Sequence, residues 1–361
     1  MRMPALIDHH CHGLVADDLD RAGFEALMNE APHASPLATT LFDSMLGLAI
    51  RRHCAPLLDL EPLVDADAYL ARRRELGAPE VNRRLLGAAG IDTFVVDTGL
   101  WRDVLTSPEE TAAYAGGSAH EIIRLEWVAE QVLQAGTDDF AGEVVSRLQA
   151  SGAVGAKSIA AYRVGLELPA TKPSADELAS ALAGVAPERL VDKTVSAWLA
   201  HTAVELGLPL QFHVGYGDSD LDLLQCDPLR LTAFLRGTVD RGVPVLLLHN
   251  WPFHRNAAYL SQVFDHVFMD LGLATHNAGV LSRTLLRETL ELVPFGKLLF
   301  SSDAFGLAEL YLVAALMFRE AAEDLLGRLV EHGEMTDNDA QRLVDLVARE
   351  NAVRAYGLDP R

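Results

Sequence analysis

Short apolar runs recur along the chain, and the stretches between them carry apolar residues at every third or fourth position. Short runs of this kind are typical of buried parallel strands, and the spacing of three to four residues is typical of amphipathic helices. Eight such runs lie at residues 5–8, 91–99, 121–127, 154–162, 208–215, 243–250, 266–272 and 297–304. The helical spacing is clearest at 140–152, 196–207, 228–242 and 283–294. Eight strands that alternate with helices predict an α/β fold, specifically a closed (β/α)8 TIM barrel.

Two regions depart from this alternation. Residues 13–90, after the first strand, hold several stretches with helical spacing, so we expect a helical insertion that serves as a lid or as an oligomer contact. Beyond the last strand, residues 310–333 and 336–358 predict two C-terminal helices. Thr336 precedes Asp339 by three residues, which is the spacing of a capping box. We expect one barrel domain over residues 1–361.

Composition narrows the class of protein. The 361 residues carry a formal net charge of −21, which disfavours nucleic acid and membrane surfaces as partners. The three cysteines form no CxxC pair, and the N-terminus lacks the apolar stretch of a signal peptide. We therefore expect a cytoplasmic protein that acts on a small-molecule substrate and assembles as a homo-oligomer.

The first apolar run leads into the sequence DHHCH at residues 8–12. On a regularly alternating strand, His10 and His12 share one face with Asp8, and His9 and Cys11 point to the other face. Two imidazoles on one face supply half of a metal site. This register predicts that His10→Ala and His12→Ala lose metal, whereas His9→Ala keeps it.

Three more polar residues stand where later predicted strands end, namely His213, His249 and Asp303. Strand ends of a barrel meet at its C-terminal mouth, where active sites form in this architecture. A histidine or aspartate buried there without a partner costs a few kcal/mol, so the pattern implies partners. Nitrogen and oxygen donors without thiolates suit a divalent cation such as zinc, manganese or iron.

Several of these stretches resemble one known family. The sequence is similar to the amidohydrolase superfamily, to its amidohydrolase-2 branch, and within it to the barrel domain of FluG-type and nodulin–glutamine-synthetase fusion proteins. The resemblance rests on IDHHCH (7–12), GAKSIAAYRVGLEL (155–168), FHVGYGD (212–218), HNWPFHRNAAYL (249–260), FSSDA (300–304) and ENAVRAYGL (350–358). These stretches follow the order of the superfamily along the whole chain.

The resemblance implies roles for the polar residues at the mouth. It implies metal ligands at His10, His12, His213 and Asp303, with His249 as a further ligand or a catalytic imidazole. Asp303 is then also the general base. Lys157 either bridges two metals as a carboxylated lysine or remains an ammonium beside one metal. We favour one ion, and zinc over manganese or iron.

Four residues are candidates for substrate binding. They are Arg163, Glu126, Lys157 and His254. Arg163 shares the face of Lys157 if the fourth strand continues that far, where it would bind a carboxylate; pairing with a surface acid is the alternative. Glu126 ends the third predicted strand, where it would either contact substrate or form a salt bridge. His254 follows the sixth strand in a loop.

The resemblance implies a metal-dependent hydrolase that attacks an amide or another C–N bond with a metal-bound hydroxide. The expected substrate is small and carboxylated, similar to a γ-glutamyl amide. The alternative is a metal-dependent decarboxylase (a lyase) of a small unsaturated or aromatic acid, because relatives use the same ligands for that reaction. Uronate-isomerase-like chemistry is a third alternative, suggested only by the long insertion.

Overall fold

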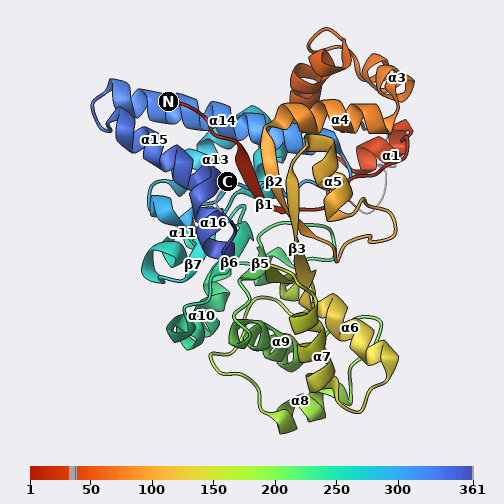
Figure 1. Cartoon of the computed structure of the whole chain (residues 1–361), viewed down its shortest axis with the longest axis vertical. Coiled ribbons are helices and arrows are strands. Elements are labelled where there is room, and N and C mark those ends of the chain that lie inside the picture. The colour runs from red at the N-terminus through yellow and green to blue at the C-terminus, as the bar shows by residue number, and fades with distance from the viewer. Residues whose placement is uncertain (32–36, 38, 360–361) are drawn as a thin grey trace.

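The computed structural model describes residues 1–31, 37 and 39–359. Its centre is a parallel sheet of seven strands whose order in space follows their order in the chain (Figure 1). The strands are β1 (Leu6–Cys11), β2 (Ile91–Asp97), β3 (Ser118–Arg124), β4 (Gly155–Ser158), β5 (Leu210–Val214), β6 (Val245–His249) and β7 (Val267–Met269). Each strand agrees with one of the first seven predicted runs.

The eighth predicted run closes the sheet into a barrel. Residues 298–304 run between β7 and β1 without the regular ladder of a strand. The backbone N–H of Leu299 donates to the carbonyl of Met269 (2.9 Å), and the N–H of Asp303 donates to the carbonyl of His10 (3.0 Å). The predicted α/β barrel is therefore confirmed, with an eighth segment of irregular backbone.

Helices surround the sheet and bury its outer face. Those that follow β2 to β7 are α5 (Pro108–Ala115), α6 (Leu125–Ala135), α7 (Phe140–Ala150), α8 (Ala175–Leu182), α9 (Lys193–Glu205), α10 (Thr232–Thr238), α11 (His254–Val263), α12 (Gly272–Ala278) and α13 (Ser282–Thr289). The helix predicted over 228–242 is shorter than expected, because 3-10 turns flank α10 on both sides. The Thr238 hydroxyl donates to the carbonyl of Phe234 (2.9 Å), a local bond that competes with helix continuation.

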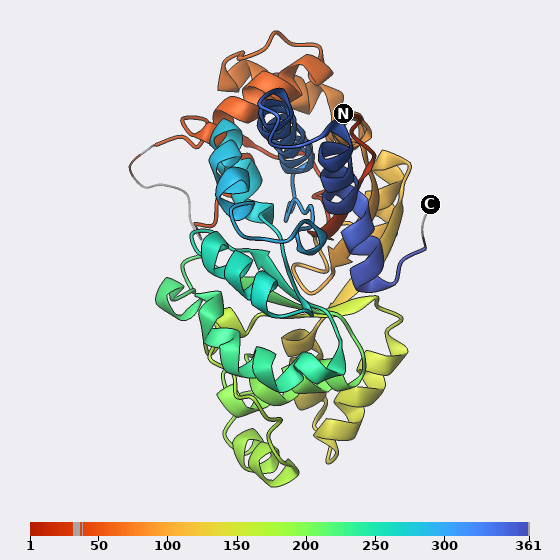
Figure 2. The ribbon, with the colours of Figure 1, turned by 90° about the vertical axis from the view of Figure 1, so that its left-hand side faces the viewer.

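The insertion after β1 is helical, as predicted. It contains α1 (Arg21–Ala26), α2 (Met45–Ala49), α3 (Ala66–Leu76) and α4 (Ala78–Ala89). Figures 1 and 2 show these helices in red to orange, beside the long blue helix α14 (Ala308–Glu331). A buried ion pair joins the two parts, since Nε of Arg73 in α3 lies 2.9 Å from Oε1 of Glu309 in α14. Residues 32–36 and 38 of the predicted insertion lie outside the described residues.

The C-terminal helices are α14, α15 (Asp337–Asp345) and α16 (Asn351–Tyr356). Thr336 caps α15, and the Asp339 carboxylate accepts from the Thr336 backbone N–H, so the predicted capping box is present. Helix α16 packs on an inner apolar cluster, with Ala355 and Tyr356 against Ile7 of β1. None of the described helices is long and apolar enough to cross a membrane.

Strand β1 does not alternate as the sequence analysis expects. Its register against β2 shifts between Asp8 and Cys11, which is the signature of a β-bulge. Past the bulge, Cys11 joins the outer core. The ring of His9, expected on the outer face, instead hydrogen-bonds to Tyr356 in the inner cluster (3.0 Å). The face predicted for His9 is therefore wrong, because regular alternation does not allow for a bulge.

Candidate metal centre

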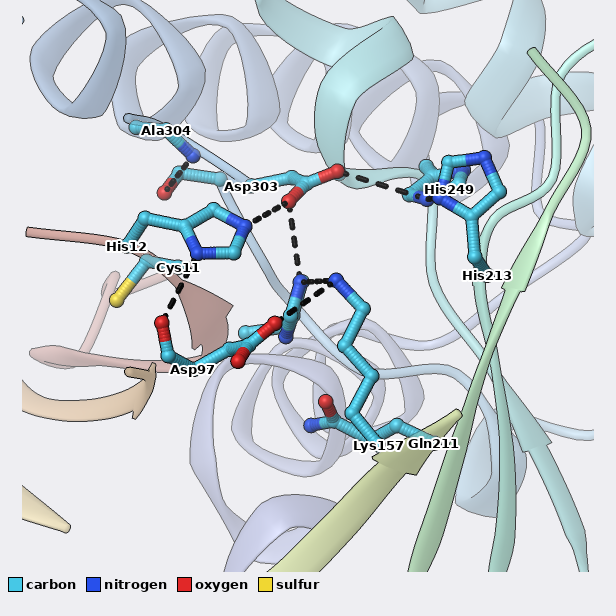
Figure 3. A network of polar contacts seen from close by, with 12 residues as sticks. Cys11, His12, Asp97, Lys157, Gln211, His213, His249, Asp303 and Ala304 are labelled. Carbon is cyan, nitrogen blue, oxygen red and sulfur yellow. Dashed lines mark hydrogen bonds and ion pairs between the residues drawn. The ribbon is translucent and has the colours of Figure 1, made fainter. Parts of the chain in front are cut away.

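The end of β1 and the closing segment bring three buried side chains together. One donor atom from each of His10, His12 and Asp303 can be chosen so that all lie within 4.8 Å of one another. Oδ1 of Asp303 lies 3.1 Å from Nε2 of His10 and 3.5 Å from Nε2 of His12 (Figure 3). One carboxylate oxygen therefore faces two imidazole nitrogens.

The ends of β5 and β6 add two more imidazoles. Nε2 of His249 lies 3.6 Å from Oδ2 of Asp303 and 3.1 Å from Nδ1 of His213 (Figure 3). The structure thus gathers all five residues that the sequence analysis places at the mouth. Both His249 and Asp303 have left-handed backbones, with φ of 46° and 49°. Such conformations of non-glycine residues cluster at functional sites.

The protonation states of these groups suit a cation. Burial lowers the pKa of His10 to about 3, with Lys157 adding to the effect. Burial, followed by the charge of His249, holds the pKa of His213 well below its usual value. Burial opposes the charge of Asp303, yet His10 and His12 hold its pKa well below the ordinary range. Near neutral pH His10 and His213 are therefore neutral imidazoles and Asp303 is a carboxylate, the forms that ligate metals.

A divalent metal fits this cluster by two further observations. The donor set is nitrogen and oxygen, which zinc and its neighbours accept. Two buried ring nitrogens, Nε2 of His213 and Nδ1 of His249, have no hydrogen-bond partner among the described residues. Buried polar atoms are rarely left unpaired in native proteins, so the absence of partners indicates an additional ligand.

Lys157 lies beside the cluster as part of an ion-pair network. Its Nζ is 2.9 Å from Nε2 of His10 and 3.3 Å from Oδ2 of Asp97 (Figure 3). The same oxygen of Asp97 accepts from Nη2 of Arg124 at 2.5 Å. Burial opposes the charge of Asp97, but Arg124 and Lys157 hold its pKa well below the usual value. One buried carboxylate therefore neutralises part of the charge of two buried cations.

Sequence reasoning missed Asp97, Arg124 and Asp270. Asp97 and Arg124 end β2 and β3, and Asp270 directly follows β7. Asp270 accepts from the backbone N–H of His249 (2.8 Å). The strand-end rule that selected His213 also points to Asp97 and Asp270, whereas Arg124 was missed because the third strand was predicted to end at Glu126.

Two residues at the mouth carried no sequence signal. The ring of Tyr162 lies 4.3 Å from the ring of His213. Glu30, from the insertion, is half-buried, and burial with the charge of Asp303 raises its pKa to about 7. The charge of Glu30 in the insertion is therefore coupled to that of Asp303, while a role of the insertion as a lid or an oligomer contact stays a prediction.

The other predicted substrate residues make contacts away from the cluster. Glu126 lies in the first turn of α6 rather than in β3, and its Oε1 accepts from the Ser158 hydroxyl at 2.7 Å. Strand β4 ends at Ser158, before Arg163, and Nη2 of Arg163 lies 3.6 Å from the largely buried carboxylate of Glu130. Nε2 of His254 is 2.8 Å from Glu288. Among the described contacts none joins these three residues to the histidines, and their substrate roles remain predictions.

Comparison with known proteins agrees with this geometry. The chain is 30% identical to the Protein fluG of Emericella nidulans over 98% of its own length. That alignment covers 46% of the relative, so the chain spans about half the length of the curated protein it matches. A candidate metal-dependent hydrolase from Lactobacillus casei ATCC 334 shares the structure, with a TM-score of 0.84, 29% identity, and 99% and 96% of the two chains covered.

A more distant structure shares the fold alone. A uronate isomerase from Thermotoga maritima matches with a TM-score of 0.63 and 15% identity, over 98% of this chain and 94% of its own.

A model of the amidohydrolase-2 family, described as Amidohydrolase, matches residues 126–358, which is more than half of the chain. The protein therefore belongs to the amidohydrolase-2 family.

Proposed function

We propose that this protein is a single-metal hydrolase that cleaves an amide or related C–N bond in a small carboxylated substrate. The observation that carries the proposal is the position of Asp303, whose Oδ1 faces His10 and His12 and whose Oδ2 faces His249. A bound divalent metal, for which zinc suits the donors, supplies a Lewis acid that polarises a carbonyl and acidifies water.

The protein's own groups account for the proton transfers. The Asp303 carboxylate is ionised near neutral pH, so Oδ2 can accept a proton from the attacking water and pass it to the leaving nitrogen. His249, 3.6 Å from that oxygen, is placed to hydrogen-bond the substrate oxygen on which negative charge develops.

The ion pair of Lys157 supports one metal ion rather than two. A bridging lysine would have to be carboxylated, which would remove the positive charge that lies 3.3 Å from the Asp97 carboxylate and add a negative charge beyond Nζ. The buried Asp97 carboxylate would lose one of its two cationic partners, and a second anion nearby would oppose its charge. Lys157 as an ammonium instead compensates the charge of Asp97, and its Nζ lies 2.9 Å from Nε2 of His10.

Arg124 supports the carboxylated substrate. Its Nη2 donates to Asp97, whereas its Nε, at the mouth end of β3, is buried and has no partner in the part of the chain that the structure describes. An arginine that retains free donors is suited to a carboxylate. A γ-glutamyl amide, which the resemblance to FluG-type proteins implies, carries such a group. Cytoplasmic location and homo-oligomeric assembly stay predictions from the sequence.

The test separates hydrolysis from decarboxylation by the product. Zinc-loaded protein would be incubated with γ-glutamyl amides and, in parallel, with aromatic and unsaturated carboxylic acids. We expect release of amine or ammonia from an amide, about one zinc per chain, and loss of turnover in Asp303→Asn. Release of carbon dioxide without amine would favour the decarboxylase, and isomerised uronates would favour the third alternative.

A further inference from the structure

A buried chain of hydrogen bonds runs from the last helix to the backbone of His249. The ring of His9 is fully buried, with Nδ1 3.0 Å from the hydroxyl of Tyr356 in α16. Its Nε2 is 2.9 Å from Oδ2 of Asp270. Oδ1 of Asp270 accepts from the backbone N–H of His249 at 2.8 Å. Helix α16 is thus connected to the centre through three side chains.

With a neutral His9 beside the Asp270 carboxylate, these hydrogen bonds run in one direction. Nε2 of Gln211 lies 3.0 Å from the carbonyl of His9 and 2.7 Å from the Tyr356 hydroxyl. Because a carbonyl only accepts, this atom is the amide nitrogen, and it donates to both oxygens. The Tyr356 hydroxyl then accepts from Gln211 and donates its single hydrogen to Nδ1 of His9. His9 therefore carries its hydrogen on Nε2 and donates it to Asp270.

His249 needs such support because its backbone is strained. Its φ is 46° and that of Asn250 is 58°, a conformation that costs a non-glycine residue free energy unless neighbouring groups hold it. Asp270 binds the His249 N–H, and Nδ2 of Asn250 donates to the carbonyl of Asp270 at 3.0 Å. Burial opposes the charge on Asp270, but the hydrogen bond from His9 keeps its pKa below the usual value.

We propose that Tyr356 and His9 are positioning residues, which act through Asp270 to hold His249 in the geometry of the metal centre. The C-terminal stretch ENAVRAYGL is then part of the catalytic apparatus, although it lies outside the mouth. This inference rests on the metal centre of the proposed function. Hydrogen-bond partners behind metal ligands usually change metal affinity or activity by roughly 10–100-fold when they are removed.

The test compares two tyrosines that each lose a buried hydroxyl. Tyr356→Phe removes the hydroxyl that hydrogen-bonds to His9. Tyr69→Phe removes a 2.9 Å hydrogen bond to Glu309, between the insertion and α14. We expect both variants to unfold at somewhat lower urea concentrations. Zinc affinity, measured by competition with a chromophoric chelator, should fall roughly 10-fold or more in Tyr356→Phe and stay within about twofold in Tyr69→Phe. Equal affinities in the two variants would overturn the inference.

Two further measurements make the test specific. His9→Ala should also weaken zinc binding, whereas the regular strand register predicts no loss. In wild-type protein with 15N-labelled histidine, NMR should show His9 protonated on Nε2 and not on Nδ1. A hydrogen on Nδ1 would overturn the proposed direction of the hydrogen bonds. A wild type that binds no zinc would overturn the metal centre together with this inference, whereas unchanged zinc affinity in both Tyr356→Phe and His9→Ala overturns only the positioning role.

Discussion

Lys157 and Asp97 form a buried ion pair, with Nζ 3.3 Å from Oδ2, at the side of the histidine cluster. Asp97→Asn would leave Lys157 and Arg124 without their shared carboxylate. Removing one partner of a buried pair typically costs about 3–5 kcal/mol, so we expect a loss of this size in the free energy of unfolding measured in urea. Asp103→Asn, at an exposed position in the following loop, is the control. A loss below about 1 kcal/mol for Asp97→Asn would show that water or rearrangement compensates the two cations.

His10 and His12 are expected to be indispensable for metal binding. Each alanine substitution removes an imidazole that faces the Asp303 carboxylate. Zinc affinity should therefore fall by more than the roughly 10–100-fold that is typical when a residue hydrogen-bonded to a metal ligand is removed. His332→Ala, which changes an exposed histidine after α14, should leave zinc content unchanged. Metal analysis of purified proteins checks this expectation, and about one zinc retained in either cluster variant would contradict the ligand assignment.

The packing of the insertion on α14 is expected to depend on the buried ion pair between Arg73 and Glu309. Arg73→Met leaves the fully buried Glu309 without its guanidinium partner, and we expect a loss of about 3–5 kcal/mol in stability. Arg74→Met changes the exposed neighbour and should alter stability by less than about 0.5 kcal/mol. If limited proteolysis cuts the insertion of Arg73→Met while the barrel stays folded, the ion pair stabilises the packing of the insertion on α14 and not the barrel. Identical urea curves for the two variants would count against any role of the pair.

His266 is expected to make stability depend on acid pH. Burial, with the charge of Lys297, lowers its pKa to about 4 from an ordinary value of 6.5. The unfolded chain therefore binds a proton as the pH falls through 6.5, while the native protein does not until near pH 4. The contribution of His266 to the free energy of unfolding is fully present above pH 6.5. It falls by up to about 3 kcal/mol as the pH is lowered towards 4.

The variant His266→Gln isolates this contribution from that of other buried histidines. Its stability, measured by urea unfolding at several pH values, should fall less steeply than that of the wild type between pH 6.5 and 4. His332→Gln, at an exposed position, should keep the wild-type slope. Parallel curves for all three proteins would mean that another group is responsible for the acid dependence.

The arrangement of strands and helices could be predicted because it depends on local hydrophobic patterns. Strands buried on both faces are almost continuously apolar, and helices show their own spacing, so all eight segments were found. Two details could not be found in this way. The bulge in β1 and the irregular closing segment 298–304 depend on how neighbouring backbones pair, which no single run of residues encodes.

The residues of the candidate site were also predictable only in part. His213, His249 and Asp303 were predictable because the ends of parallel strands meet at one mouth, whatever the details of the packing. Arg163 and His254 were expected near substrate, but each lies beside an acid from another element, Glu130 and Glu288. Such partners are separated along the chain, and their pairing appears only when the helices are packed.

The sequence by itself determined the barrel, the helical insertion and the set of metal-competent side chains, because these follow from periodicity and from positions at strand ends. Only the tertiary structure decided which buried groups support that set. Asp97 beside Lys157, Glu30 near the mouth, and Tyr356 bonded to His9 across 347 positions of sequence are examples. A hydrogen bond or ion pair requires an approach of about 3 Å between atoms, and only the folded chain brings distant residues that close.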